Sequence, residues 1–215
     1  MKLYNGNLSP NALRVRAVVY ELGIEVETVD VDFRVGGNRT PEFLKLNPNG
    51  KVPVLVDGDL VLWESRAINA YLATKYPAKN LYPADLRQRA FVDQWSYWQA
   101  IHLGPAMQRV VFERAQKAAF GRGPADETVV AAEMKNVGQF LDVLESGLAD
   151  GREWIAGALS IADFALATTF VFRVAAGISL DQRSHVAGWI ARMEQRPSWQ
   201  KAVGDMPALP KPKAA

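Results

Sequence analysis

Ser9 is the first residue whose type and position could support chemistry, because it stands directly before Pro10 at a predicted helix start. Serine followed by proline is typical of a helix N-terminus, so the simplest interpretation is that Ser9 is an N-cap. A capping oxygen accepts a backbone hydrogen bond while its proton can still be donated, and the positive helix end favours an anion. Ser9 could therefore also stabilise a bound thiolate. Lowering a thiol pKa from about 8.5 by ~2 units, roughly 2.7 kcal/mol, would leave most of the thiol ionised at pH 7.

Glu64 and Ser65 form a second polar pair, at the junction between a predicted strand and a predicted helix. The structural interpretation is that Ser65 caps the helix. The same helix end could hold a carboxylate through the backbone N–H and the hydroxyl of Ser65, and Glu64 could hold an ammonium group. An amino-acid head group carries both charges, so this pair would suit such a ligand.

A third candidate segment runs from Asn47 to Pro53 and consists of turn residues that lead into a predicted strand. It can be interpreted as a loop, since proline is tolerated at the first residue of a strand. Alternatively, the Val52–Pro53 bond is cis, and the backbone there pairs with an extended peptide ligand. The residues alone leave both interpretations open.

Composition excludes several other kinds of chemistry. The chain of 215 residues has no cysteine, which excludes disulfides, thiolate metal sites, cysteine nucleophiles and Cys-x-x-Cys oxidoreductases. His102 and His185 lack companions at ligand spacing, so no metal is expected. The net charge of +2 gives no strong field for nucleic acid or an anionic membrane. No apolar run approaches the ~20 residues of a membrane span, and no secretory signal opens the chain, so a cytoplasmic protein is expected.

The elements that must position these residues are predicted from periodicity and turn signals. The first part of the chain has the order β-α-β-α-β-β-α, in which a helix between two early strands implies a parallel crossover. An Asp57–Gly58 turn predicts a closing hairpin. We expect strands over 2–4, 25–31, 54–56 and 60–63, and helices over 10–22, 41–46 and from Ser65 onwards.

Beyond Tyr76 the strand signals disappear and long helical patterns follow. We expect helices over about 86–118, 126–149, 160–176 and 183–195. Ser160 and Asp163 form a capping box at the third of these helices, and this box is interpreted as structural. The predicted domains are an α/β domain over 1–77, a linker over 78–86, an all-helical domain over 87–207 and a tail over 208–215.

In this order and at these spacings, the segments resemble the cytosolic glutathione transferases. The likeness rests on Ser9, on Asn49–Pro53, on Glu64–Ile68 and on the capping segment Gly157–Asp163. The stretch Leu8–Arg16 resembles the serine-type classes, namely phi, theta and their bacterial relatives, and a bacterial relative is expected. The resemblance covers about residues 1–205 and implies a thioredoxin-like α/β N-terminal domain followed by an all-α C-terminal helical domain.

The resemblance also implies roles for individual residues. Ser9 would be the catalytic residue, and glutathione would bind as a substrate. The Val52 backbone before a cis Pro53 would hold the cysteinyl part, and Glu64 with Ser65 would hold the γ-glutamyl end. The other residues implied to support or contact glutathione are Asn11, Lys51, Asn38, Arg39 and Asp93, the last through a neighbouring subunit. Several phi-like members carry histidine in place of Asn38, which leaves open how the glycyl carboxylate is held.

Aromatic residues need separate treatment. Tyr4 could replace Ser9 as in the tyrosine-type classes, but its place within a strand favours a packing role. Phe91, Trp95 and Trp98 share one helix face, for which core packing is the default. The resemblance implies a co-substrate pocket between the domains, to which Trp98, Met107 and Phe112 could contribute.

We therefore expect a glutathione S-transferase that activates the glutathione thiol for attack on a small, hydrophobic electrophile, and that forms a homodimer. Conjugation, dehalogenation, isomerisation and peroxide reduction are not separated by these residues. The absence of cysteine disfavours cysteine-type transferases and maleylacetoacetate isomerases. The alternative is a non-catalytic carrier or protein-interaction module of the same fold. The presence of Ser9 and of the Glu64–Ser65 pair favours the enzyme.

Overall fold

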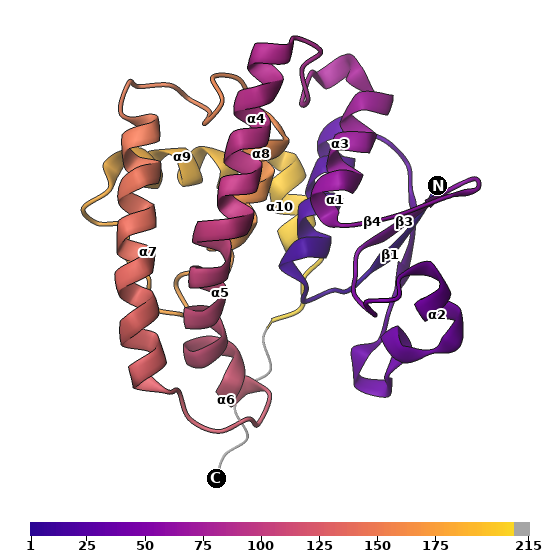
Figure 1. Cartoon of the computed structure of the whole chain (residues 1–215), viewed down its shortest axis with the longest axis horizontal. Helices are drawn as coiled ribbons and strands as arrows, with labels where there is room; N and C mark the ends of the chain where they lie inside the picture. The colour runs from indigo at the N-terminus through magenta and orange to yellow at the C-terminus, as the bar shows by residue number, and fades with distance from the viewer. Residues whose placement is uncertain (209–215) are drawn as a thin grey trace. The chain divides into compact units, whose positions relative to one another are not determined.

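The computed structural model describes residues 1–208, so nearly all of the predicted tail lies outside the described residues. Two compact units account for the described chain (Figure 1). The first unit consists of Met1–Pro83 and Arg196–Pro207, and the second consists of residues 84–195. The segment Arg196–Pro207, which the sequence analysis placed in the helical domain, thus packs with the α/β part.

A four-stranded sheet with the order β2-β1-β3-β4 forms the centre of the first unit. The strands are β1 (Lys2–Asn5), β2 (Glu27–Asp30), β3 (Val54–Asp57) and β4 (Leu60–Trp63). Strands β1 and β2 are parallel, and β3 is antiparallel to both β1 and β4. The predicted crossover and hairpin are therefore confirmed. Strand β2 is shorter than predicted because its pairing is limited to the four residues of β1.

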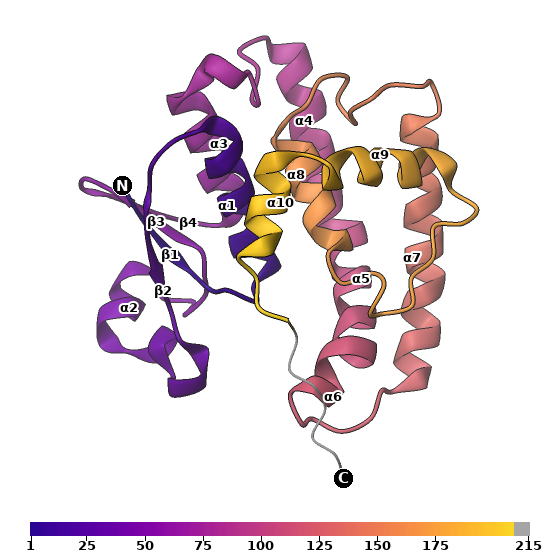
Figure 2. The same cartoon turned by 180° about the vertical axis from the view of Figure 1, so that it is seen from behind.

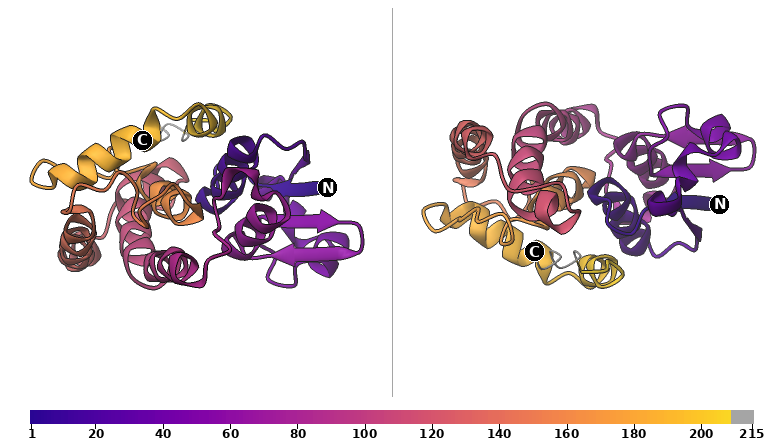
Figure 3. Two further views of the ribbon diagram at one scale, coloured as in Figure 1. Left: turned by 90° about the horizontal axis from the view of Figure 1, so that it is seen from above. Right: turned by 90° about the horizontal axis from the view of Figure 1, so that it is seen from below.

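The two faces of the sheet carry different residues, because successive side chains of a strand alternate. Leu3 and Leu55 pack in a buried cluster with side chains of α1 (Pro10–Leu22) and α3 (Ser65–Lys75), which lie side by side (Figure 3). Tyr4 and Val54 join a second cluster that includes Phe43 of α2 (Pro41–Leu46). The Tyr4 and Phe43 rings meet edge to face at 5.9 Å, which confirms a packing role for Tyr4.

Helix α10 (Pro197–Gly204) lies against α1 and was not predicted (Figure 2). Its first turn holds the Glu21 carboxylate, which accepts from Arg196 Nη2 at 2.5 Å and from Ser198 Oγ at 2.5 Å. Near its end, Tyr20 donates to Asp205 at 2.6 Å. This eight-residue helix has no side-chain N-cap, so its stability must come mainly from packing on α1.

The described residues of the second unit form helices as predicted, apart from two isolated β-bridges within residues 154–158. The expected helix over 86–118 is a continuous helical run in which π-helical turns alternate with α-helix. Pro105 lies at the start of α5 and cannot donate to the α-helical ladder, which accounts for the π-helical turn before it. The run consists of α4 (Leu86–Trp98), η4 (Gln99–Leu103), α5 (Gly104–Val111), η5 (Phe112–Gln116) and α6 (Lys117–Ala119).

Three further α-helices follow, namely α7 (Glu127–Leu148), α8 (Ile161–Ala167) and α9 (Ser184–Glu194). The predicted helix over 160–176 is wrong in its extent, because α8 ends at Ala167 and continues only as a 3-10 turn, Thr168–Phe170. The Thr168 hydroxyl donates to the Ala165 carbonyl at 3.0 Å and so competes with the helical backbone bonds.

The predicted capping box at α8 is confirmed. Asp163 is fully buried, and its carboxylate accepts from four donors: the backbone N–H groups of Ile155 and Ser160, the Ser160 hydroxyl and the Trp189 indole N–H. Burial raises the pKa of the Asp163 carboxyl, and these four hydrogen bonds oppose the rise. Across residues 1–208, no helix is both long and apolar enough to cross a bilayer.

Candidate functional site

The sheet brings the three candidate segments to one edge of the first unit. Tyr4 near the end of β1 pairs with Val54 at the start of β3, and Val54 also pairs with Trp63 at the end of β4. The loop after β1, the loop before β3 and the start of α3 therefore meet at neighbouring strand ends. Chain topology thus places Ser9, Val52 and Ser65, which are far apart in sequence, in one region.

Ser9 is the N-cap of α1, as predicted from the Ser9–Pro10 pair. Its Oγ accepts from the backbone N–H of Ala12 at 3.3 Å, and its side chain is partly exposed. Among residues 1–208, the Ala12 N–H is the donor to this hydroxyl oxygen, so the hydroxyl proton can be donated to a ligand. The position at the N-terminus of a 13-residue helix adds a favourable field for an anion.

The side chains of Val52, Phe33 and Ser9 lie close together around Gly6. The Val52–Pro53 bond is cis, the second of the two interpretations left open by the sequence. A Cβ atom on Gly6 would lie 2.8 Å from Val52 Cγ2, 2.9 Å from Phe33 Cε2 and 3.6 Å from Ser9 Cβ, so all three side chains meet at this glycine. Phe33 is 48% exposed. Phe33 is not among the predicted site residues, and its signal in the sequence is an aromatic residue between Asp32 and Arg34 in a polar loop.

Ser65 is the first residue of α3, and Glu64 takes the N-cap position without a side-chain cap hydrogen bond. The expected helix start at Ser65 is therefore confirmed, whereas the interpretation of Ser65 as the N-cap is wrong by one residue. The Ser65 hydroxyl instead accepts from the buried guanidinium of Arg14 at 2.7 Å. Glu64 has φ 72° and ψ 109°, an uncommon backbone conformation for a residue with a side chain. Such strained positions cluster at binding sites, where the surrounding structure enforces them.

Arg14 is a second residue that the sequence analysis missed. The same Nη1 atom that reaches Ser65 also donates to Asn11 Oδ1 at 2.7 Å. Burial and the nearby Arg66 guanidinium lower the pKa of Arg14, while the Glu64 carboxylate raises it. A buried arginine linking the starts of α1 and α3 has no local sequence signal, because its partner Ser65 is 51 residues away.

Asn38 and Arg39 lie against the loop that precedes Val52. Asn38 is buried and donates through Nδ2 to the Gly50 carbonyl at 2.8 Å, which makes it a brace for this loop. A Cβ on Gly50 would lie 2.9 Å from Arg39 Nη1, so the Arg39 side chain covers this glycine. Arg39 and Lys51 are both exposed, and they are the cations available here for a ligand carboxylate.

Asn47 holds the other side of the same loop and was not predicted. Its Nδ2 donates to the Lys51 carbonyl at 2.7 Å, and its Oδ1 accepts from the backbone N–H of Asn49 at 3.0 Å. Two buried amide side chains, Asn38 and Asn47, thus fix the backbone that leads into the cis bond.

The remaining predicted site residues belong to the second unit. Asp93 lies half-buried on α4. Trp98 is partly buried in an aromatic cluster, with its ring 5.2 Å from that of Trp95 and 6.2 Å from that of Phe140. Met107 is fully buried, so its expected place on the wall of an open pocket is not supported. Phe112 is partly exposed, with the Arg122 guanidinium 5.9 Å from its ring centre.

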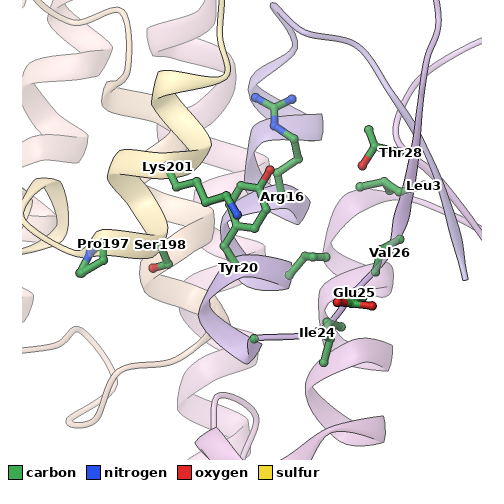
Figure 4. Close-up of a pocket in the computed structure, with 12 residues that line it drawn as sticks. Leu3, Arg16, Tyr20, Ile24, Glu25, Val26, Thr28, Pro197, Ser198 and Lys201 are labelled. Atoms are coloured by element: carbon green, nitrogen blue, oxygen red, sulfur yellow. The ribbon is translucent and has the colours of Figure 1, made fainter.

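A pocket of about 520 Å³ opens elsewhere in the first unit, between β2, α1 and α10 (Figure 4). Its walls include Arg16, Tyr20 and Lys201, and none of the predicted site residues lines it. In residues 1–208, no group of three or more His, Asp or Glu side chains is arranged to hold a metal ion.

Comparison with known proteins identifies the two parts of the chain. Residues 1–74 match the N-terminal domain of glutathione S-transferases, and residues 127–192 match their C-terminal domain. Glutathione S-transferase 3 of Zea mays is 37% identical, and the match covers 100% of this chain and 98% of the relative.

Solved structures of glutathione S-transferases are also similar to this chain. A structure of glutathione S-transferase I bound with lactoylglutathione has a TM-score of 0.88 at 33% identity, covering 95% of this chain and 99% of that one. Glutathione S-transferase I from maize, in complex with an atrazine glutathione conjugate, has a TM-score of 0.87 at 33% identity, covering 99% of both chains. The named maize relatives do not support the bacterial relationship expected from the sequence. The chain belongs to the glutathione S-transferase family.

Proposed function

We propose that this chain is a glutathione transferase of the serine type, in which Ser9 stabilises the thiolate of bound glutathione for attack on a small, hydrophobic electrophile. The observation that carries the proposal is the position of Ser9. Its hydroxyl caps the positive end of α1, and its side chain meets that of Val52, the residue before the cis bond, at Gly6. Relatives of this chain are named glutathione S-transferases, and one such structure holds a glutathione conjugate.

Three parts of glutathione are assigned to three parts of the site. The cysteinyl part would pair with the Val52 backbone, as an extended peptide pairs with a strand edge. The γ-glutamyl end would meet Glu64 and Ser65 at the N-terminus of α3, where backbone N–H groups favour a carboxylate. The glycyl carboxylate would lie near Arg39 and Lys51. Asn38 would act indirectly, since its amide already braces Gly50.

For the attack on the electrophile, the site must stabilise the negative charge of the glutathione thiolate and orient its sulfur. A hydrogen bond from the Ser9 hydroxyl to the sulfur, together with the field of α1, favours the thiolate over the thiol. The tripeptide held at both ends presents that sulfur in one direction, which lowers the entropic cost of attack. Phe33 would flank the sulfur and offer an apolar surface to the electrophile. Trp98 and Phe112 remain candidates for the co-substrate pocket.

The decisive experiment is the pKa of the glutathione thiol when bound, measured by thiolate absorbance in the ultraviolet for the wild type and for Ser9→Ala. We expect a depressed pKa in the wild type that returns towards about 8.5 in the variant. Binding with an unshifted pKa in the wild type would contradict the proposed role of Ser9 and favour a non-catalytic carrier.

The same proposal includes a homodimer in which Asp93 reaches the site of the neighbouring subunit. It also includes a cytoplasmic location and domain limits at residues 77 and 87. Exposed apolar side chains on α4, among them Leu86 and Phe91, offer a surface for a second copy. Light scattering during size-exclusion chromatography tests the dimer, and the mass of a single chain at micromolar concentration would refute it.

A further inference from the structure

Arg14 makes two short hydrogen bonds from one atom in the interior of the first unit. The residue is 3% exposed, and its Nη1 donates to Asn11 Oδ1 and to Ser65 Oγ, both at 2.7 Å. Its backbone carbonyl accepts from Asn69 Nδ2 of α3 at 3.3 Å. One side chain therefore links the start of α1, which carries Ser9, to the start of α3.

These contacts fix where its two partners can donate. A guanidinium has donors only, so it must meet the oxygen of the Asn11 amide, and the Asn11 NH₂ group then faces the other way. At Ser65 the guanidinium occupies a lone pair of the hydroxyl oxygen, so the hydroxyl proton must be donated elsewhere. A hydroxyl that accepts from a cation is also polarised into a better donor.

We propose that Arg14 is a positioning residue that orients the Ser65 hydroxyl to donate to the α-carboxylate of the γ-glutamyl group, while holding Asn11 beside Ser9. This inference rests on the proposed function and deepens it. Arg14 does not itself touch glutathione; it acts through Ser65 and Asn11.

The cost of burying Arg14 supports a role beyond packing. A buried charge is expensive to desolvate, and an apolar residue of similar volume often stabilises a fold as well or better. Within residues 1–208, the buried Arg14 Nε atom has no hydrogen-bond partner, which adds to that cost. The nearby charges are Arg66, which is cationic, and Glu64, which is anionic. A ligand carboxylate at Ser65 would therefore place a second negative charge near two cations.

Arg16 provides a matched control on the same helix. It is 4% exposed, and its buried Nε likewise has no hydrogen-bond partner in the described part of the chain. Its guanidinium donates to Asn5 Oδ1 at 2.6 Å and to the Ala202 carbonyl at 3.1 Å, and it lines the pocket beside α10 (Figure 4). Arg14 and Arg16 thus share burial, residue type and helix, but only Arg14 contacts Ser65.

The test is a double-mutant cycle on the full chain, with the Kd of glutathione measured by calorimetry for Arg14→Met, Ser65→Ala and the double variant. If Arg14 acts through Ser65, each single variant weakens binding by about 10-fold and the double variant by little more than that. A glutathione derivative whose γ-glutamyl α-carboxylate is an amide serves as a second probe. We expect the wild type to prefer glutathione over this amide, and Arg14→Met to lose most of the preference.

Arg16→Lys should lower thermal stability but leave the Kd within about 2-fold. Three results would each overturn the positioning role. The first is a Kd in the double variant that rises by the product of the two single effects. The second is an unchanged preference for the carboxylate in Arg14→Met, and the third is a Kd in Arg16→Lys that rises as much as in Arg14→Met. If Arg14→Met does not fold, Arg14→Lys with and without Ser65→Ala supplies the same cycle. A wild type that fails to bind glutathione would refute the proposed function itself, a result distinct from a failed cycle in a protein that binds.

Discussion

Arg196 donates to both carboxylate oxygens of Glu21, at 2.5 and 3.2 Å, across 175 positions of sequence. Ser198 adds a third hydrogen bond to the same carboxylate at 2.5 Å. Burial alone would raise the pKa of Glu21, but the hydrogen bonds from Arg196 and Ser198 outweigh it and lower the pKa below its ordinary value. Glu21 thereby joins α1 to the start of α10.

Because the pKa of Glu21 is lower in the folded chain, its contribution to stability is complete above the unfolded pKa and is lost as pH falls through the folded pKa. Glu21→Gln should therefore lower the free energy of unfolding by about 2 kcal/mol at pH 7. The difference from wild type should shrink in acid, as measured by urea unfolding at several pH values. Glu27→Gln removes an exposed ion pair with Lys2 and should change little. A constant deficit for Glu21→Gln down to pH 3 would contradict the assignment.

Asp163→Asn should destabilise the second unit severely. The carboxylate accepts from four donors in a fully buried position, and an amide would turn an NH₂ group towards at least one of them. We expect a loss of about 3 kcal/mol, measured by thermal or urea unfolding. Asp150→Asn, which alters an exposed pair with Arg152, is the control and should have little effect. If both variants lost a similar amount of unfolding free energy, burial of the Asp163 hydrogen bonds would not explain their contribution to stability.

Gly50→Ala should weaken glutathione binding more than it weakens the fold. Gly50 has φ +61°, and a Cβ there would lie 2.9 Å from both Arg39 Nη1 and the Asn38 carbonyl oxygen. The loop before Val52 must shift to relieve these contacts, so we expect the Kd of glutathione to rise by about 10-fold. Gly58→Ala is matched in backbone, with φ +63° and no atom within 4 Å of its Cβ. It should lose comparable stability, about 1 kcal/mol, and no affinity. If Gly50→Ala and Gly58→Ala bound glutathione with equal affinity, the loop before Val52 would have no role in glutathione binding.

Tyr20 should ionise at a higher pH than a free tyrosine side chain. Burial, the hydrogen bond to Asp205 and the charge of Asp205 raise the pKa of Tyr20 to about 12. With the folded pKa above the unfolded one, this stabilisation is present below about pH 10 and is lost as pH rises towards 12. Titration of tyrosinate absorbance should show a late step that is absent in Tyr20→Phe. If the step lost in Tyr20→Phe occurs near pH 10, the pH at which a free tyrosine ionises, that result would contradict the Tyr20–Asp205 contact.

Local signals predicted much of this fold. Ser9 before Pro10, the Asp57–Gly58 turn and the Ser160–Asp163 box each specify backbone geometry within a few residues, and the structure contains all three. Such features are predictable because the hydrogen bonds that define them close locally. The positions of Ser9, Val52 and Ser65 at one sheet edge follow from the predicted strand order once β1, β3 and β4 pair.

The features that were missed depend on partners far away in sequence. Helix α10 has no side-chain cap and exists through its contacts with α1, about 180 residues earlier. Arg14 has no signal in the sequence that distinguishes it from other helical residues, because its contact with Ser65 forms only when α3 packs against α1. The end of α8 at Ala167 was missed because threonine still fits a helical pattern, although its hydroxyl competes for the backbone.

The division of the first unit between Met1–Pro83 and Arg196–Pro207 has a consequence for biosynthesis. A ribosome releases the N-terminal segment first, at about 5–20 residues per second, and domains tend to fold as they emerge. The buried Arg16 guanidinium, however, donates to the carbonyl of Ala202, which is made only after residues 84–195. The first unit therefore cannot be completed until residues 84–195 have been translated, because α10 follows them and packs on α1.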